Sequence, residues 1–389
     1  MRHGPRKVLV FMNRFLLGGQ ERQTVLHLRT VDRTRWQPIV ACFRVEGEHV
    51  AELEEIGAAP ESLDIRSMGR PHTAVRVLQL AQRLRRERIA IVHSQDYYTD
   101  VLGTLAARLA GIPSIVTRVD LSHQHGTARR AALAGVSRLA TRVLVNALCI
   151  RDLCLADGVA SDRIAVVRNG MDLAAFDAAA ARTPALPVPA GDRPTIVNVA
   201  NMHHPVKGQE DLLVAMREVV KAFPRAQLVL VGGGDRMLSL EKLANDLDIR
   251  DAVHFLGHRT DVPALMSRAT LSVSASYAEG ISNAIMEGMA ARRPVVGTAV
   301  GGTPELVREG VTGWLVPPGA PAHMARRIVD VLRDPEAGRR MGEAGRKLVA
   351  TEFTVEQMKL SYEALYSALA ESSYGGGILE RPAALGVAG

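Results

Sequence analysis

The chain has 389 residues, 47% of them apolar and 23% charged, so it is long enough to build two globular domains with a full core in each. Its three cysteines are scattered and odd in number, which argues against a disulfide framework and favours a reducing compartment. No apolar run approaches the length of a transmembrane helix or a signal-peptide core, so we expect a cytoplasmic protein.

The excess positive charge lies in the first half of the sequence. Residues 1–182 hold 26 Lys and Arg against 18 Asp and Glu, whereas the remainder holds 22 against 23. This excess predicts an anionic partner, such as the inner face of a membrane, a polyprenyl diphosphate or an acidic glycan. A solvated arginine-rich surface explains the same excess equally well. We expect no nucleic acid partner, because aromatic residues are not interleaved with the arginines.

Short β-rich runs alternate with helical patterns along the chain. In the first half the predicted strands are Lys7–Met12, Pro38–Phe43, Ala90–His93, Ser114–Thr117, Val143–Asn146 and Ile164–Val167, separated by helices such as Gln20–Arg29, Thr73–Arg86 and Thr99–Leu109. In the second half the strands are Thr195–Val199, Gln227–Val231, Val253–Leu256, Thr270–Ser274, Pro294–Thr298 and Trp314–Val316, with helices such as Gln209–Ala222 and Met237–Leu247. This alternation is typical of parallel sheets covered by helices on both faces.

A proline-rich stretch separates the two halves, with four prolines within residues 182–194. The predicted domains are therefore 1–182 and 195–352, joined by a linker at 183–194 and followed by a helix at 353–370 and a flexible tail at 371–389. We expect the helix to pack back on the N-terminal domain. The predicted fold class is α/β, with two doubly wound Rossmann-like domains facing across a cleft. Ligands of such sheets bind beyond the carboxyl ends of the strands.

Two glutamates eight positions apart, Glu279 and Glu287, flank a predicted helix start. Glu279 and Gly280 lie in a loop after a strand, and Ser282 and Asn283 are good N-caps for the helix that follows. The N–H groups at a helix start form a ready anion site. Such a helix end suits the diphosphate of a nucleotide sugar, while the two carboxylates suit sugar and ribose hydroxyls.

Other candidate residues also follow the ends of strands. Lys207 precedes a helix and suits the charge of a diphosphate leaving group, and Gly18 and Gly19 open the helix after the first strand. Leu256 and Gly257 end another strand and suit a flat nucleobase. Taken singly, each of these features is explained as well by a tight turn or a solvated side chain. We find no metal site and expect no cofactor.

The order of these motifs resembles the family-4 retaining glycosyltransferases, which have the two-domain GT-B fold. The resemblance runs from Thr195 to about Val316. It rests on Lys207-Gly208, Leu256-Gly257, Glu279-Gly280-x-Ser282-Asn283-Ala284-x-x-Glu287, Pro294-Val-Val-Gly, Gly301-Gly302-Thr-Pro304-Glu305-Leu and Gly310-Val-Thr-Gly313-Trp-Leu-Val-Pro317-Pro-Gly319. The first half is similar more loosely, through Gly18-Gly19-x-Glu21, Ile91-Val92-His93 and Asn169-Gly170-Met-Asp172. In this family the first half holds the acceptor.

The resemblance implies a role for each matching residue. Glu279 contacts the donor sugar beside the reacting carbon, Lys207 stabilises the departing diphosphate, and Glu287 accepts hydrogen bonds from ribose hydroxyls. Leu256 and Gly257 frame the base. Gly18 and Gly19, in the other domain, close over the diphosphate. The segment that holds the diphosphate at the helix start comprises Gly280, Ile281, Ser282, Asn283 and Ala284.

The chain departs from the family pattern at two places. Asn201 stands where the family often has an arginine that works with its lysine, and it is retained as a donor-binding candidate. The family also has a histidine near the end of an N-terminal strand, and here Asp120 and His123 are the two candidates for its catalytic role. We interpret His93 as a core histidine at a strand end.

These expectations combine into retaining transfer of a sugar from a UDP- or GDP-sugar to a hydroxyl acceptor, in the biosynthesis of a polysaccharide or a lipid-linked glycan. Peripheral association with an anionic membrane stays open. Two alternatives remain on the same scaffold: a sugar-nucleotide 2-epimerase and a non-catalytic sugar-nucleotide binding protein. A nicotinamide dehydrogenase is disfavoured, because Met237 stands where the third glycine of the dinucleotide fingerprint is needed.

Overall fold

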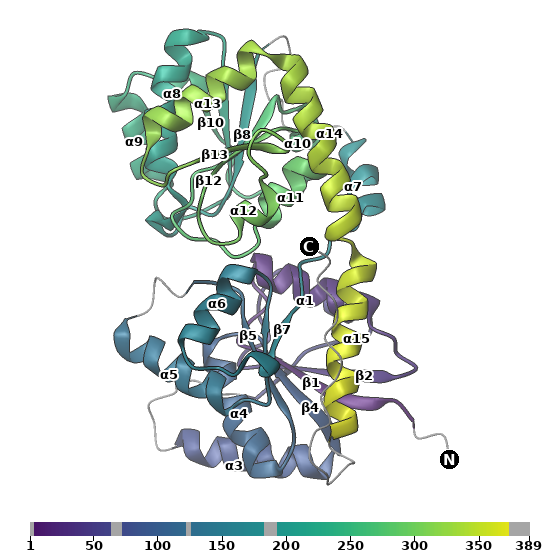
Figure 1. Cartoon of the computed structure of the whole chain (residues 1–389). Coiled ribbons are helices and arrows are strands. Elements are labelled where there is room, and N and C mark those ends of the chain that lie inside the picture. Colours follow the sequence, from purple (N-terminus) through teal and green to yellow (C-terminus); the bar gives the residue numbers. More distant parts are fainter. Residues whose placement is uncertain (1–3, 64–71, 122–125, 183–192, 373–389) are drawn as a thin grey trace. The chain divides into compact units, whose positions relative to one another are not determined.

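The computed structural model describes residues 4–63, 72–121, 126–182 and 193–372, and it contains two parallel sheets (Figure 1). The predicted linker at 183–194 falls almost wholly outside the described residues, as do His123 and the tail from residue 373 onward. Among the described residues, no helix is both long enough and apolar enough to cross a membrane.

The first sheet has seven strands in the order β3-β2-β1-β4-β5-β6-β7. The strands are β1 (Arg6–Met12), β2 (Trp36–Cys42), β3 (Glu61–Ser62), β4 (Ile89–Ser94), β5 (Ser114–Arg118), β6 (Arg142–Val145) and β7 (Ile164–Val166). The helices among them are α1 (Gly19–Thr30), α2 (Val50–Glu55), α3 (His72–Arg86), α4 (Tyr97–Ala110), α5 (Thr127–Leu139), α6 (Leu148–Ala156) and α7 (Leu173–Ala180). Strand β1 runs parallel to both β2 and β4, with Val10 opposite Val40 on one side and His93 on the other.

The second sheet has six strands in the order β10-β9-β8-β11-β12-β13. The strands are β8 (Thr195–Val199), β9 (Gln227–Val231), β10 (Val253–Phe255), β11 (Leu271–Ser274), β12 (Val295–Thr298) and β13 (Gly313–Val316). The helices that follow β8 in the chain are α8 (Gln209–Ala222), α9 (Met237–Asp246), α10 (Val262–Arg268), α11 (Asn283–Ala290), α12 (Thr303–Leu306), α13 (Pro321–Arg333), α14 (Pro335–Glu352) and α15 (Val355–Ser372). The crossover between β8 and β11 places the ends of these two strands side by side.

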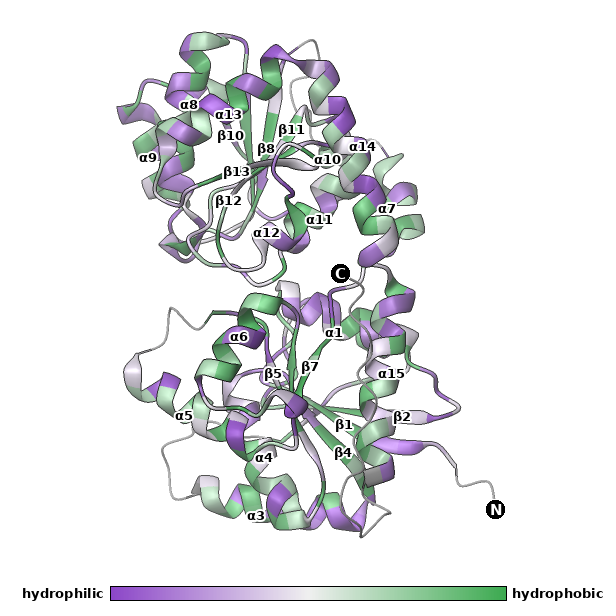
Figure 2. Ribbon diagram, in the orientation of Figure 1, coloured by the Kyte–Doolittle hydropathy of each residue, from purple (hydrophilic) through white to green (hydrophobic). Residues whose placement is uncertain are grey.

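Helices lie on both faces of each sheet, and the hydropathy pattern explains why (Figures 1 and 2). The central strands are apolar and buried on both sides, as β9 shows with five buried residues in a row. The covering helices bury apolar side chains; α13 buries Met324, Ala325 and Ile328 and exposes arginines elsewhere. Strands of this kind need cover on both faces, which is the physical basis of the α/β class.

The chain forms two compact units. Of the described residues, unit 1 comprises those up to 117, those of 132–144 and those from 359 onward, and unit 2 comprises those of 118–131 and 145–358. The part of α15 from Lys359 onward therefore belongs to unit 1. There Tyr366 is 1% exposed, and its hydroxyl lies within hydrogen-bond distance of two buried histidines, 3.0 Å from His27 Nε2 and 2.8 Å from His93 Nδ1.

Every strand predicted from the sequence is present, with ends that shift by at most two residues. Strand β3 was not predicted, because its two residues, Glu61 and Ser62, are polar and pair only with the last residues of β2. A strand this short carries no alternation of apolar and polar residues from which it could be recognised. His93 lies in the core of the sheet, as expected.

Candidate active site

Lys207 is held in place by the turn between β8 and α8. The turn Pro205–Lys207 ends at Gly208, which adopts a left-handed conformation with φ +64°. A Cβ at Gly208 would lie 2.1 Å from the carbonyl oxygen of Ala275, so only glycine allows the backbone to approach that closely. The turn is thereby packed against the end of β11.

Glu279 lies in the loop after β11 and faces Lys207. Its Oε1 atom accepts a hydrogen bond from Lys207 Nζ at 2.6 Å and another from Ser276 Oγ at 2.6 Å. The Lys207 side chain is 22% exposed and that of Glu279 is 14% exposed, so the pair is partly shielded from water. A charge-assisted hydrogen bond in such surroundings is stronger than one on the open surface.

Helix α11 begins at Asn283, as the sequence predicts, and Ser282 is its N-cap. The Ser282 hydroxyl accepts a hydrogen bond from the Ile285 N–H at 3.4 Å. The N–H groups of the first turn point along the helix axis and make this end electropositive. Glu279, Gly280 and Ile281 lead directly into that end, so the carboxylate, the lysine and the helix start belong to one locality.

Two glycines from another loop fix the backbone around Glu279. The Gly302 N–H donates to the carbonyl oxygen of Glu279 at 3.2 Å, and a Cβ at Gly301 would lie 1.8 Å from the same oxygen. Gly280 is equally confined, because its Cβ would lie 2.2 Å from the carbonyl oxygen of Val119. The loop therefore has little room to move at Glu279.

Three of the remaining predicted residues of unit 2 lie after the carboxyl ends of strands β8 and β10, which are separated by β9. Asn201 is exposed after β8, and Leu256 and Gly257 follow β10, where Gly257 has φ +62° and accepts a hydrogen bond from the Gly232 N–H at 2.8 Å. Glu287 is different, because it lies within α11 and is only 3% exposed. Its contact with a ribose stays a prediction.

The candidates from the first half of the sequence lie at the start of α1 and after β5. Gly18 is the N-cap of α1 and Gly19 its first residue, both in unit 1, and a Cβ at Gly18 would lie 2.0 Å from Oε2 of Glu21. Asp120 is exposed, follows the end of β5 and belongs to unit 2. His123 lies outside the described residues, so the choice between it and Asp120 stays open.

Sequence reasoning missed the asparagines that reach the start of α11. The Asn169 side chain donates to Asn283 Oδ1 at 2.9 Å and to the carbonyl oxygen of Ile281 at 3.3 Å. Asn146 in turn donates to Asn169 Oδ1 at 3.1 Å. The only signal in the sequence was the Asn169-Gly170 pair, and nothing local links it to a helix that begins 114 residues later.

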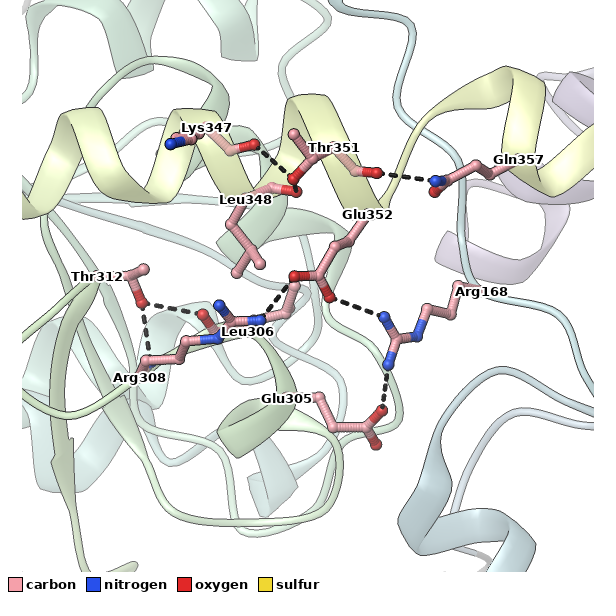
Figure 3. Close-up of polar contacts among 10 residues, drawn as sticks. All are labelled: Arg168, Glu305, Leu306, Arg308, Thr312, Lys347, Leu348, Thr351, Glu352 and Gln357. Atoms are coloured by element: carbon pink, nitrogen blue, oxygen red, sulfur yellow. Dashed lines mark hydrogen bonds and ion pairs between the residues drawn. The ribbon is translucent and has the colours of Figure 1, made fainter. Parts of the chain in front are cut away.

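An ionic network includes Glu305, which follows Gly301 and Gly302 in the chain (Figure 3). Arg168 contacts Glu352 at 3.0 Å and Glu305 at 3.9 Å, and Arg308 contacts Glu352 at 2.7 Å. Glu305 also accepts a hydrogen bond from the Leu148 N–H at the start of α6, at 2.7 Å. Burial raises the pKa of Glu305, while its hydrogen bond to Leu148 opposes that rise. Glu305 thus ties the segment after Gly301 and Gly302 to α6.

The geometry suits the binding of a phosphorylated ligand and the stabilisation of a departing diphosphate. A lysine and the start of a helix supply positive charge where negative charge would develop, and a carboxylate lies beside them. Among the described residues, no group of three or more His, Cys, Asp or Glu side chains is placed to hold a metal ion.

Two family models match the chain, and together they cover both halves. The model described as Glycosyltransferase Family 4 matches residues 17–175, and that described as Glycosyl transferases group 1 matches residues 193–334. The second match contains the Lys207, Glu279 and α11 region.

Curated relatives align over part of their length. N-acetyl-alpha-D-glucosaminyl L-malate synthase of Bacillus anthracis is 33% identical over 171 residues, which is 44% of each chain. Putative glycosyltransferase EpsD of Bacillus subtilis is 35% identical over 162 residues, 41% of this chain and 42% of that protein. The chain therefore spans less than half the length of these relatives.

Solved structures show the same fold over nearly the whole chain. Alr3699/HepE of Anabaena, crystallised in complex with UDP-glucose, superposes with a TM-score of 0.80 at 21% identity, covering 93% of this chain and 99% of that one. Sucrose-phosphate synthase of Thermosynechococcus elongatus superposes with a TM-score of 0.76 at 20% identity, covering 94% and 100%. With family models matching both halves and this fold, the chain belongs to the family-4 glycosyltransferases and has their two-domain GT-B fold.

Proposed function

We propose that the protein transfers a sugar from a nucleoside-diphosphate sugar to a hydroxyl acceptor, with retention of the anomeric configuration. The observation that carries this proposal is the contact of Lys207 and Glu279 at 2.6 Å beside the start of α11. A glycosyl diphosphate needs a cation, a carboxylate and helix-start N–H groups near one another, and this contact supports that arrangement.

In the proposed reaction the bond between the sugar and the diphosphate breaks first. Lys207 and the N–H groups at Ile281, Ser282, Asn283 and Ala284 stabilise the negative charge that builds up on the leaving group. Glu279 lies against the sugar, whose anomeric carbon becomes electron-poor. The acceptor hydroxyl then attacks from the same face, and the departing phosphate takes its proton. No side-chain nucleophile is required.

The proposed donor is a UDP- or GDP-sugar, with the base against Leu256 and Gly257 and the ribose near Glu287. The UDP-glucose bound to the Anabaena protein supports testing UDP-sugars first. A thermal-shift panel of UDP-, GDP- and ADP-sugars identifies the base, because a ligand that binds only the folded protein raises its melting temperature.

The proposed acceptor is a glycan, either free or linked to a lipid, and we propose that the protein meets an anionic membrane through unit 1. Arginines and exposed leucines gather there where α3, α4 and α5 end. Arg85 donates to the carbonyl oxygen of Ala110 at 3.2 Å, and Arg108 donates to that of Leu139 at 3.2 Å. Leu109 is 49% exposed and Leu139 43%. Basic and aliphatic side chains together suit a lipid surface of negative charge.

Two substitutions test the proposed reaction. Glu279→Gln and Lys207→Ala should each lower the rate of transfer at least about a hundredfold, the scale on which a key electrostatic group acts. The measurement is sugar transfer from the identified donor, and circular dichroism confirms that each variant is folded. Near-normal turnover in both variants would refute the assignment.

The two alternatives make different products. A sugar-nucleotide 2-epimerase would convert the donor when no acceptor is present, so incubation of the protein with the nucleotide sugar alone distinguishes it from a transferase. A non-catalytic binding protein would bind the nucleotide tightly and leave donor and acceptor unchanged.

A further inference from the structure

Lys207 has an anionic partner within its own chain. Its ammonium lies 2.6 Å from Oε1 of Glu279, and both side chains are largely shielded from water. We propose that Lys207 binds the donor diphosphate. The carboxylate of Glu279 and the diphosphate would then compete for the positive charge of Lys207.

The pair is held from both sides by backbone contacts, so it is a built feature of the fold. The Tyr277 N–H donates to the carbonyl oxygen of Val206 at 2.7 Å, which joins the loop of Glu279 to the turn of Lys207. Gly208 packs against the carbonyl oxygen of Ala275, as described above. Neither loop can carry its charged side chain away from the other without breaking these contacts.

Ser276 fixes the carboxylate further. Its hydroxyl donates to the same oxygen that Lys207 contacts, and its own carbonyl oxygen accepts a hydrogen bond from Thr298 Oγ1 at 2.5 Å. Ser276 and Thr298 are each 2% exposed. Oε1 of Glu279 therefore accepts two hydrogen bonds. If Lys207 binds another anion instead, this oxygen keeps its hydrogen bond from Ser276.

We propose that Glu279 is a placeholder for the donor diphosphate, which must displace it from Lys207 to bind. This inference rests on the proposed function and adds to it a rule of specificity. A ligand with the charge of a diphosphate competes well for Lys207, whereas a nucleoside monophosphate competes poorly. The exchange also releases Glu279 from the lysine only when a donor is in place, so the carboxylate becomes available to the sugar at that moment.

The test is the affinity of the nucleoside diphosphate, measured without any acceptor. Isothermal titration calorimetry uses whichever of UDP, GDP and ADP stabilises the protein most, together with the matching monophosphate. Glu279→Gln keeps the shape of the side chain and its hydrogen bond to Ser276 but removes the competing charge. We expect the diphosphate to bind this variant about tenfold more tightly than wild type, the size of one hydrogen bond between charged groups. The gain for the monophosphate should be clearly smaller.

Two further variants serve as controls. Glu218→Gln removes a charge from the exposed pair of Glu218 with Lys221, 2.7 Å apart on the same unit, and should leave the affinity unchanged. Lys207→Ala should weaken binding of the diphosphate at least about tenfold, because the cation itself is gone. Melting curves establish that each variant is folded.

The outcomes separate this inference from the proposed function. An unchanged or weaker affinity of Glu279→Gln for the diphosphate would overturn the placeholder, and loss of transfer in that variant would still support a glycosyltransferase. An equal gain for the diphosphate and the monophosphate, or the same gain in Glu218→Gln, would also overturn it. Failure of wild type to bind any of the three diphosphates would overturn both.

Discussion

At the scale of single residues, the hydroxyl of Ser276 determines how Glu279 is presented. Ser276 is buried and donates to Oε1 of Glu279 at 2.6 Å, three positions along the chain. A carboxylate held at one oxygen presents the other in a fixed direction, which matters where it must stabilise a short-lived charge. Ser276 touches no reacting atom in the proposed reaction, so we regard it as a positioning residue.

We therefore expect Ser276→Ala to lower kcat about tenfold while the KM for the donor changes little, because one hydrogen bond to a charged group is lost. Ser276→Thr keeps the hydroxyl and should restore most of the activity. Steady-state kinetics of the three proteins provide the measurement. A loss that appears mainly in KM, or that threonine fails to repair, would show that Ser276 serves only the packing of the loop.

At the scale of elements, the end of helix α15 is bound to unit 1 through two buried histidines. His27 stacks on Tyr362 with ring centroids 3.8 Å apart, and both His27 and His93 lie within hydrogen-bond distance of the Tyr366 hydroxyl. Burial lowers the pKa of His93 to about 3 and lowers that of His27 well below its usual value, with the neighbouring His93 adding to the effect. Both rings are thus neutral beneath α15, and acid must charge them.

This arrangement predicts a fold that weakens in mild acid. The two histidines favour the folded state fully above pH 6.5, their ordinary pKa, and that contribution is lost as the pH falls toward the folded-state values. Each histidine lowers the free energy of unfolding by up to about 1.4 kcal/mol per pH unit below that point. Urea unfolding between pH 7.5 and 5.5 measures the slope.

The double variant His27→Gln/His93→Gln should lose this slope, and it provides the comparison. Glu21 has the opposite effect on the free energy of unfolding over part of this pH range, because burial raises its pKa to about 7. Since both proteins contain Glu21, its effect cancels when their pH dependences are subtracted. An identical pH dependence in the two proteins would contradict the assignment.

At the scale of the whole molecule, part of the positive charge of residues 1–182 lies at the ends of α3 and α4 in unit 1. Arg85 and Arg108, at the ends of α3 and α4, donate hydrogen bonds to carbonyl oxygens at the ends of α4 and α5. Leu109 and Leu139 lie exposed among them. Charge alone would suit many anionic partners, whereas charge combined with aliphatic side chains favours a lipid bilayer.

We expect the protein to sediment with vesicles that contain anionic phosphatidylglycerol and to leave neutral phosphatidylcholine vesicles unbound. The double variant Leu109→Ser/Leu139→Ser should bind the anionic vesicles at least about tenfold more weakly, because two aliphatic side chains that would enter the bilayer are lost. Leu238→Ser is the matched control, since Leu238 is 75% exposed in unit 2. Equal binding by all three proteins would exclude this surface as the membrane contact.

The sequence by itself determined the elements and most of the local chemistry. Runs of β-branched residues predict twelve strands, and the N-cap at Ser282 predicts the start of α11, because both signals act over a few neighbouring residues. The resemblance identified the family, which the family models confirm. The roles of the individual site residues stay proposals.

Only the tertiary structure decided which of these residues meet. Lys207 and Glu279 are 72 positions apart, and they form a pair because the sheet order places β8 beside β11. Asn169 reaches Asn283, and Tyr366 reaches His27 and His93, across separations of more than a hundred residues. Periodicity and capping describe a residue's immediate neighbours, whereas contacts of this kind depend on strand order and helix packing, which no short stretch of sequence encodes.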